Sequence, residues 1–226
     1  MKIWENLIED TKKIIPSDVQ CEIKMINSMD SLTRFANSHI HQNVEEEMTD
    51  LYLTFHSDGK TTNLNFNITS LGSIDEVVKK ALSEIASNPK DSSWPGLASK
   101  ENSYDGYKNL SPENPDLRAQ KVKDFIDQGG SFNGAGYCSS NVSNVFVWNT
   151  NGLSSSDTAT SAFLDGIFRS ETSSGSSHLG HKTLENIDGE KVGQEAYSIA
   201  KESQNPQDID PGVYEVILGP DAVSTI

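Results

Sequence analysis

The amino-acid sequence predicts an α+β fold of two related halves, in which antiparallel β meanders pack against α-helices. Three observations lead to this prediction. Long segments alternate apolar and polar residues, as strands with one buried face do. Asp-Gly and Asn-Gly pairs, which accept the positive φ of tight turns, interrupt these segments. Segments with apolar residues three and four positions apart, as in amphipathic helices, stand before and after them.

Residues 1–87 are expected to form the first half. An amphipathic helix opens it and ends at Pro16. The segment CEIKMIN follows as a strand, and residues 31–69 form a meander with a hairpin turn at Ser57-Asp58-Gly59-Lys60. Ser73 caps the closing helix. The apolar faces of the two helices are expected to be Trp4, Leu7, Ile8, Ile14 and Ile15, and Ile74, Val77, Val78, Ala81, Leu82 and Ile85.

Residues 88–114 are rich in Pro, Gly, Ser and Asn and have no apolar period, so they are expected to link the halves. Their three aromatic residues, Trp94, Tyr104 and Tyr107, indicate a loop that lies on the surface of a domain rather than a free tether.

Residues 115–210 are expected to form the second half. Asn114 caps its first helix, with Pro115 at the first helical position and Gly129-Gly130 after the end. A meander follows with a turn at Asn149-Thr150-Asn151-Gly152, and its Ser174-Gly175-Ser176 segment has the composition of a flexible loop. The segment IDGEKVGQEAYSIAKES closes the half as a helix.

The order of these elements indicates an internal duplication. SIDEVVKKALSEIA and NIDGEKVGQEAYSIA both contain Ile-Asp at their start, end on Ala and share the helical spacing of apolar residues. Each follows a meander with a Gly-containing turn. The sequence leaves open whether the two halves form one continuous sheet.

Composition excludes several classes of function. Among 226 residues, 33 are acidic and 18 basic, which gives a net charge of −15. Such a surface repels nucleic-acid phosphates and anionic membranes, so neither partner is expected. The N-terminus lacks the apolar stretch of a signal peptide, and no apolar run approaches membrane-spanning length. Cys21 and Cys138 are expected to be buried free thiols in a reducing compartment, which favours a cytoplasmic protein.

No complete catalytic or metal site can be assembled from the sequence. His178 and His181 are three residues apart in a Gly/Ser segment, and His39 and His41 share one face of a predicted strand without a third ligand. We interpret both pairs as surface histidines, with a metal site as the alternative. The run from Glu45 to Glu47 is interpreted as a solvated strand edge that resists aggregation. Gly-X-Ser-X-Gly and phosphate-binding glycine motifs are absent from the sequence.

The segment PGVYEVILGPDAVSTI has the pattern of a new structural unit. A Pro-Gly turn precedes Tyr214 to Leu218, which are expected to form a buried strand, and Pro220 stands where a helix could start. We interpret residues 211–226 as the opening of a further, C-terminal domain.

The sequence resembles the N-terminal region of the TldD/PmbA family, historically called modulators of DNA gyrase. The resemblance covers nearly the whole chain. The segments that carry it are Arg34-Phe35-Ala36-Asn37, Ser57-Asp58-Gly59-Lys60, the helix from Ile74 to Ala86, VFVWN with Thr150-Asn151-Gly152, Val192-Gly193-Gln194-Glu195-Ala196, and PGVYEVILGPDAV.

The resemblance implies part of a metal-dependent peptidase assembly that processes small peptides. TldD-type members carry a His-Glu-X-X-X-His zinc motif just after the strand that matches Tyr214 to Leu218. This chain has Pro220-Asp221-Ala222-Val223 there, as PmbA-type (TldE) members do. The implied partners are a TldD-like catalytic subunit, which would hold the zinc, and a peptide substrate; a homodimer is a further possibility. No metal ligand and no catalytic residue are expected in this chain.

The polar alternating segment GLSSSDTATSAF could bind an extended peptide through main-chain hydrogen bonds. The residues expected to take part are Asn149, Asn151, Gly152, Ser154 and Ser156. The simpler alternative is an ordinary solvated sheet face. Two other functions stay open: a stand-alone protein-binding or assembly module, and a hydrolase that uses His178 or His181.

Overall fold

A computed structural model describes residues 2–68, 73–111 and 114–226 of the chain. The elements up to the middle are α1 (Lys2–Ile14), β1 (Gln20–Ala36), β2 (His39–Ser57), β3 (Lys60–Asn67), α2 (Ile74–Ser87), the 3₁₀ turn η2 (Lys100–Asn102) and β4 (Asp105–Gly106). The remainder are α3 (Pro115–Ile126), β5 (Asn133–Asn149), β6 (Ser154–Arg169), β7 (Ser174–His181), the 3₁₀ turn η3 (Leu184–Asn186), α4 (Gly189–Glu202) and α5 (Pro220–Val223).

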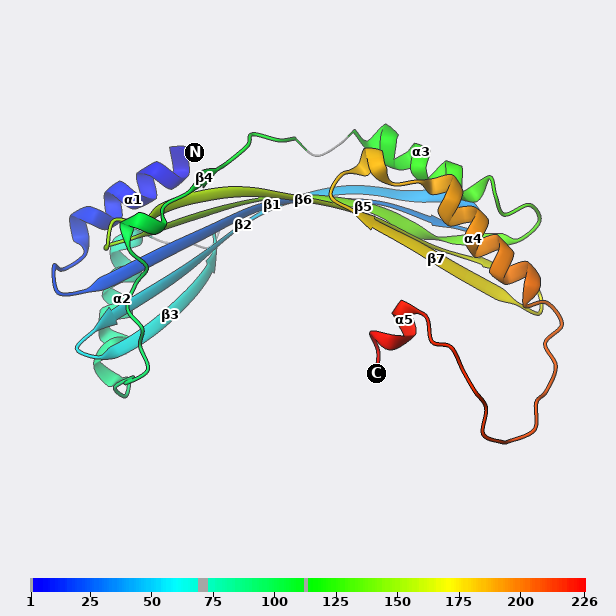
Figure 1. Ribbon diagram of the computed structural model, residues 1–226. Coiled ribbons are helices and arrows are strands. Elements are labelled where there is room, and N and C mark those ends of the chain that lie inside the picture. Colours follow the sequence, from blue (N-terminus) through cyan, green and yellow to red (C-terminus); the bar gives the residue numbers. More distant parts are fainter. Residues whose placement is uncertain (1, 69–72, 112–113) are drawn as a thin grey trace.

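All strands belong to one curved sheet, in the order β3-β2-β1-β5-β6-β4, with β7 also paired to β6. Every pair is antiparallel except the short β4–β6 pair. The sheet forms an arch, with α1 on its outer side at one end and α3 and α4 on its outer side at the other (Figure 1). The question that the sequence left open is therefore answered: β1 and β5 join the two halves into a continuous sheet.

The predicted α+β class is confirmed, and the element order repeats as the sequence indicates. A helix, three antiparallel strands and a helix occur first as α1-β1-β2-β3-α2 and again as α3-β5-β6-β7-α4. The caps predicted at Ser73 and Asn114 are also present: Ser73 Oγ accepts a hydrogen bond from the Glu76 N–H at 3.3 Å, and Asn114 Oδ1 accepts one from the Asp116 N–H at 2.8 Å. None of the described helices is long and apolar enough to cross a membrane.

The first strands are longer than the sequence predicts. CEIKMIN is not a separate strand but part of the 17-residue β1, which a two-residue turn connects to β2. That turn is Asn37-Ser38, with φ of 49° and 58°, whereas the turn at Asp58-Gly59 has φ of 48° and 73°. Positive φ is expected where Gly is present and is easily missed at Asn-Ser, which is why only the second hairpin was predicted.

The segment Ser174–Ser176 is not a flexible loop but the start of edge strand β7. A Cβ on Gly175 would lie 2.3 Å from Ala200 N and 2.4 Å from Ala196 O, both in α4. Glycine is therefore needed here because the strand approaches the helix backbone closely. The small residues that resembled a linker in composition serve this close packing.

The expected buried strand from Tyr214 to Leu218 is also absent. This segment has no regular secondary structure and pairs with no described strand, and Val213 and Ile217 are fully exposed. The helix expected at Pro220 is present as the four-residue α5, away from the sheet (Figure 1).

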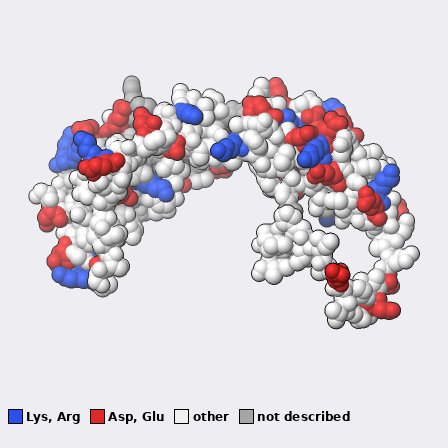
Figure 2. Space-filling model, viewed as in Figure 1, with Lys and Arg blue, Asp and Glu red and all other residues white. Residues whose placement is uncertain are grey.

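The sheet carries two apolar cores on its helix-covered side. In the first, α1 and α2 cover β1, β2 and β3, and in the second, α3 and α4 cover β5, β6 and β7. Charged side chains of both signs gather over α1 at one end and over α3 and α4 at the other (Figure 2). The first core contains Phe146 and Trp148 of β5, and the second contains Phe35 of β1. Each central strand thus contributes to both cores.

Arg118 is a fully buried charge between α3 and the sheet. Its guanidinium donates to Ser140 Oγ at 3.4 Å, to Asn43 Oδ1 at 3.3 Å and to Glu45 Oε1 at 3.2 Å. A buried charge is tolerated only when it is paired and hydrogen-bonded, and these contacts come from β5 and β2. Arg118 therefore ties a helix of the second half to a strand of the first.

We predict that Arg118→Ala lowers the free energy of unfolding by about 2–4 kcal/mol, because it leaves a cavity and removes the donor from the buried Ser140 hydroxyl and from the more exposed Asn43 and Glu45. The matched control is Lys123→Ala on the same helix, whose exposed ion pair with Asp127 contributes less than about 0.5 kcal/mol. Urea unfolding followed by circular dichroism measures both. Equal effects of the two substitutions would contradict this role of Arg118.

Candidate functional site

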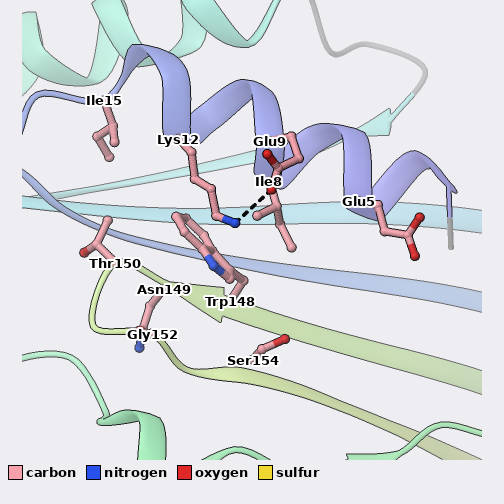
Figure 3. A pocket seen from close by; sticks show the side chains of 10 residues that line it. All are labelled: Glu5, Ile8, Glu9, Lys12, Ile15, Trp148, Asn149, Thr150, Gly152 and Ser154. Atoms are coloured by element: carbon pink, nitrogen blue, oxygen red, sulfur yellow. Dashed lines mark hydrogen bonds and ion pairs between the residues drawn. The ribbon is translucent and has the colours of Figure 1, made fainter.

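A cleft of about 620 Å³ lies between α1 and the hairpin that joins β5 to β6. In Figure 3 one wall consists of α1 side chains and the other of residues on and after β5. Its lining residues are Glu5, Ile8, Glu9, Lys12, Ile15, Trp148, Asn149, Thr150, Gly152 and Ser154. Three of the five residues predicted to bind peptide (Asn149, Gly152 and Ser154) are thus brought together here.

The cleft combines an apolar floor with polar walls. Trp148 is mostly buried, and Lys12 Nζ lies 5.9 Å from its ring centroid, close enough for a cation–π contact. Lys12 also forms an ion pair with Glu9 at 2.8 Å (Figure 3). Sequence reasoning missed this wall, because nothing in the pattern of α1 shows which strand its polar residues face. Such a cleft suits a short ligand with polar groups that can reach the charged side chains of α1.

A smaller cleft of about 300 Å³ adjoins the first and shares Glu5, Ile8 and Ser154 with it. It also contains Ser156, another of the predicted residues, together with Tyr104 and Tyr107 of the segment between the halves. Tyr107 packs against Phe146 with ring centroids 5.3 Å apart. The aromatic residues of this segment therefore lie on the folded surface, as the sequence indicated.

Asn149 is fully buried and organises the hairpin. Its Oδ1 accepts hydrogen bonds from the N–H groups of Asn151 at 3.0 Å and Leu153 at 3.1 Å. Its Nδ2 donates to Ala98 O at 2.9 Å, while Asn151 Nδ2 donates to Leu97 O at 3.1 Å. Both asparagine amides thus hold the turn and the neighbouring segment in place.

The outer edge of β6 is occupied by residues 102–108 of the same chain. Ser156 N–H donates to Tyr104 O at 2.8 Å, Ser154 N–H donates to Ser103 Oγ at 3.0 Å, and Lys108 N–H donates to Thr158 Oγ1 at 2.9 Å. β4 runs parallel to β6 within this segment. Peptide binding through Asn149, Asn151, Gly152, Ser154 and Ser156 therefore stays a prediction, and a peptide that added to this edge would have to displace the chain's own segment.

The histidine pairs lie on strands rather than in loops. His178 and His181 belong to β7, where their odd spacing places them on opposite faces, and His178 stacks on Phe163 with centroids 5.5 Å apart. His39 and His41 are exposed at the start of β2. Within residues 2–68, 73–111 and 114–226, no three or more His, Cys, Asp or Glu side chains form a group that could hold a metal ion.

Both cysteines are buried, and neither forms a disulfide bond among the described residues, as predicted. Burial, with a smaller contribution from the charge of Glu22, raises the pKa of the Cys21 thiol to about 12. The thiolate is the reactive form of cysteine, so Cys21 is not a nucleophile at neutral pH.

Comparison with known proteins identifies the fold. No family model and no curated protein matches the sequence. Three solved structures are similar: a proposed modulator of DNA gyrase from Thermotoga maritima (18% identity, TM-score 0.67), TldE from Thermococcus kodakarensis (18%, 0.64) and a proposed modulator of DNA gyrase from Bacteroides thetaiotaomicron (13%, 0.72). They cover 93%, 88% and 92% of this chain, whereas this chain covers 50%, 47% and 51% of theirs. The chain therefore shares their fold and spans about half their length.

We predict that Asn149→Ala lowers the free energy of unfolding by about 2 kcal/mol, because it leaves the buried Leu153 N–H and the partly buried Asn151 N–H without their acceptor. Asn151→Ala is the matched control: its side chain is exposed and makes one hydrogen bond, so the loss is below about 1 kcal/mol. Thermal and urea unfolding measure both. A larger effect at Asn151 than at Asn149 would show that the buried amide does not organise the turn.

Proposed function

We propose that this chain is the N-terminal region of a TldE/PmbA-type protein and serves as a non-catalytic part of a peptidase assembly that acts on small peptides. The observation that carries the proposal is the common fold, which extends over about nine-tenths of this chain and includes a structure named TldE. Pro220-Asp221-Ala222-Val223, which matches the PmbA type in sequence, agrees with this assignment.

Peptide handling is supported by the surface around the β5–β6 hairpin. Residues 103–108, which follow the 3₁₀ turn η2 and include β4, already lie along β6 and are held there by main-chain and serine contacts. This edge is therefore compatible with an extended polypeptide that binds through its main chain, so that the identity of its side chains has little effect on binding. The adjoining clefts add carboxylates, Glu5 in both and Asp105 in the smaller one, that suit a cationic terminus or side chain.

The zinc of such an assembly belongs in our proposal to a TldD-like partner. The described residues of this chain provide no set of ligands that fits the ion, and we assign them no step of metal chemistry. The role of this chain is then to bind the partner and to position the peptide. An effect on gyrase would operate through a protein or peptide, because a net charge of −15 disfavours contact with DNA.

A second candidate is a protein-binding or assembly module without catalysis. It is favoured by the outer edge of β2: the residues before Asp50 pair with β1 on one side, and on the other side they pair with no described strand. The two candidates differ in the partner that they require. The first needs a subunit with a His-Glu-X-X-X-His motif, and the second does not.

Co-expression with a TldD-type subunit from the same source tests the proposal. We expect the tagged chain to retain that subunit through affinity purification and to elute with it as one complex in size-exclusion chromatography with light scattering. An unrelated acidic protein of similar size and charge is the control for non-specific retention. If the chain instead elutes free of the subunit, or forms a stable assembly by itself, the peptidase role is wrong and the assembly module is favoured.

A further inference from the structure

We propose that the outer edge of β2, residues 43–49, binds an extended segment of another polypeptide that carries lysine or arginine, as an added β-strand. This interaction surface is separate from the clefts beside α1 and does not rest on the proposed peptidase role. Three observations lead to it: an internal comparison of the two halves, the direction of the backbone groups and the distribution of charge.

The outer edges of β2 and β6, which are equivalent in the two halves, have different neighbours. β3 pairs with β2 from Asp50 onwards, and β7 pairs with β6 from Ala162 onwards, so the first part of β2 and of β6 extends beyond its outer neighbour. At β6 the chain fills this edge with residues 102–108. At β2 no described strand does so. Because the two halves repeat the same architecture, the covered edge of β6 shows that an edge of this kind accepts an extended segment.

The backbone groups that face outward can be assigned from the hairpin. Asp58-Gly59 is a two-residue turn, so Ser57 and Lys60 form a hydrogen-bonded pair and Ser57 directs its N–H and C=O towards β3. Direction alternates along a strand, so every second residue before Ser57 faces the same way. Asn43, Glu45, Glu47 and Thr49 therefore present their N–H and C=O groups at the outer edge. This is a ready template for a further strand.

The edge is strongly acidic. Glu45, Glu46 and Glu47 are all exposed. Glu46 lies directly opposite Asp30 of β1, and like charges in this position destabilise a sheet. Ammonium or guanidinium groups of an added strand would relieve this repulsion. Arg118 of α3 forms an ion pair with Glu45 from the helix-covered face of the sheet and holds this part of β2 in place.

The pattern of side chains defines the segment that fits. On the face opposite the helices, Glu46 stands between Val44 and Met48, which are 42% and 37% exposed. Glu45 and Glu47 lie on the other face of the sheet, which also carries the buried residues Leu51 and Leu53. An added strand would therefore place apolar residues beside Val44 and Met48 and basic residues beside the three glutamates. A second copy of this chain does not fit, because paired β2 edges would bring their carboxylates together.

The probe is a fluorescein-labelled peptide with the core Val-Lys-Lys-Lys-Val between threonines, which is palindromic and so tests both strand directions. We expect it to bind the full chain in fluorescence anisotropy. Glu46→Lys/Glu47→Lys should weaken binding at least tenfold, and Glu185→Lys/Glu202→Lys, with the same change of net charge on exposed sites elsewhere, should change it less than about threefold. Equal weakening by both pairs would show general charge attraction and overturn the proposal.

Two further measurements test strand addition itself. Glu47→Pro removes an outward N–H but none that faces β1, so the fold should persist in circular dichroism while peptide binding is lost. A peptide of equal charge with prolines at alternate positions should not bind wild type, which tests the same point without any change to the protein. Amide exchange should slow at Glu45, Glu47 and Thr49 on binding, and not at Val44 and Glu46.

The proposal is wrong if the proline-containing peptide binds as well as the probe, or if the probe does not bind at all. In the second case the carboxylates only keep the edge from aggregating. It is also wrong if light scattering shows that wild type dimerises and Glu47→Pro does not, because a second copy would then occupy the edge.

Discussion

The structure depends on the antiparallel pairing of β1 with β5. These strands are each 17 residues long and are paired from Glu22–Asn149 to Phe35–Gly136. Each half has its own helices, but neither core is built from one half alone. Phe146 and Trp148 extend from β5 into the first core, and Phe35 extends from β1 into the second. The pairing register therefore fixes the contents of both cores together.

The position of the surface sites follows from this pairing. Because β5 ends beneath α1, the β5–β6 hairpin of the second half meets the first helix of the first half, and the larger cleft forms between them. Arg118 makes the corresponding contact in the other direction, from α3 to Asn43 and Glu45 of β2. Both sites thus combine residues that are distant in sequence. The pairing of β1 with β5 within one shared sheet brings them together.

Local patterns in the sequence predicted the elements well where a single signal decides the structure. Apolar spacing, the caps at Ser73 and Asn114 and the glycine turn after Asp58 identified helices and a hairpin in their observed places. The Asn37-Ser38 turn and strand β7 were missed, since their structure depends on tertiary context rather than composition. Gly175 resembles a linker residue until the proximity of α4 is known.

The candidate site could be predicted only in part for the same reason. The sequence singled out the hairpin, and three of its predicted residues do line the cleft. It could not reveal that α1 supplies the opposite wall, that the Asn149 side chain is engaged in the turn, or that residues 102–108 cover the edge of β6. The fully buried Arg118 was likewise hidden, because a single charge in an amphipathic helix ordinarily faces solvent.

Native-state hydrogen exchange at increasing sub-denaturing urea tests the central claim most directly. If β1–β5 pairing joins both cores, amide protons in the middle of β1 and of β5 should exchange only through global unfolding, with the same free energy in both strands. The peripheral strands β3 and β7 should open at lower free energy. The account is contradicted if one half loses its protection, central strand included, while the other half retains it.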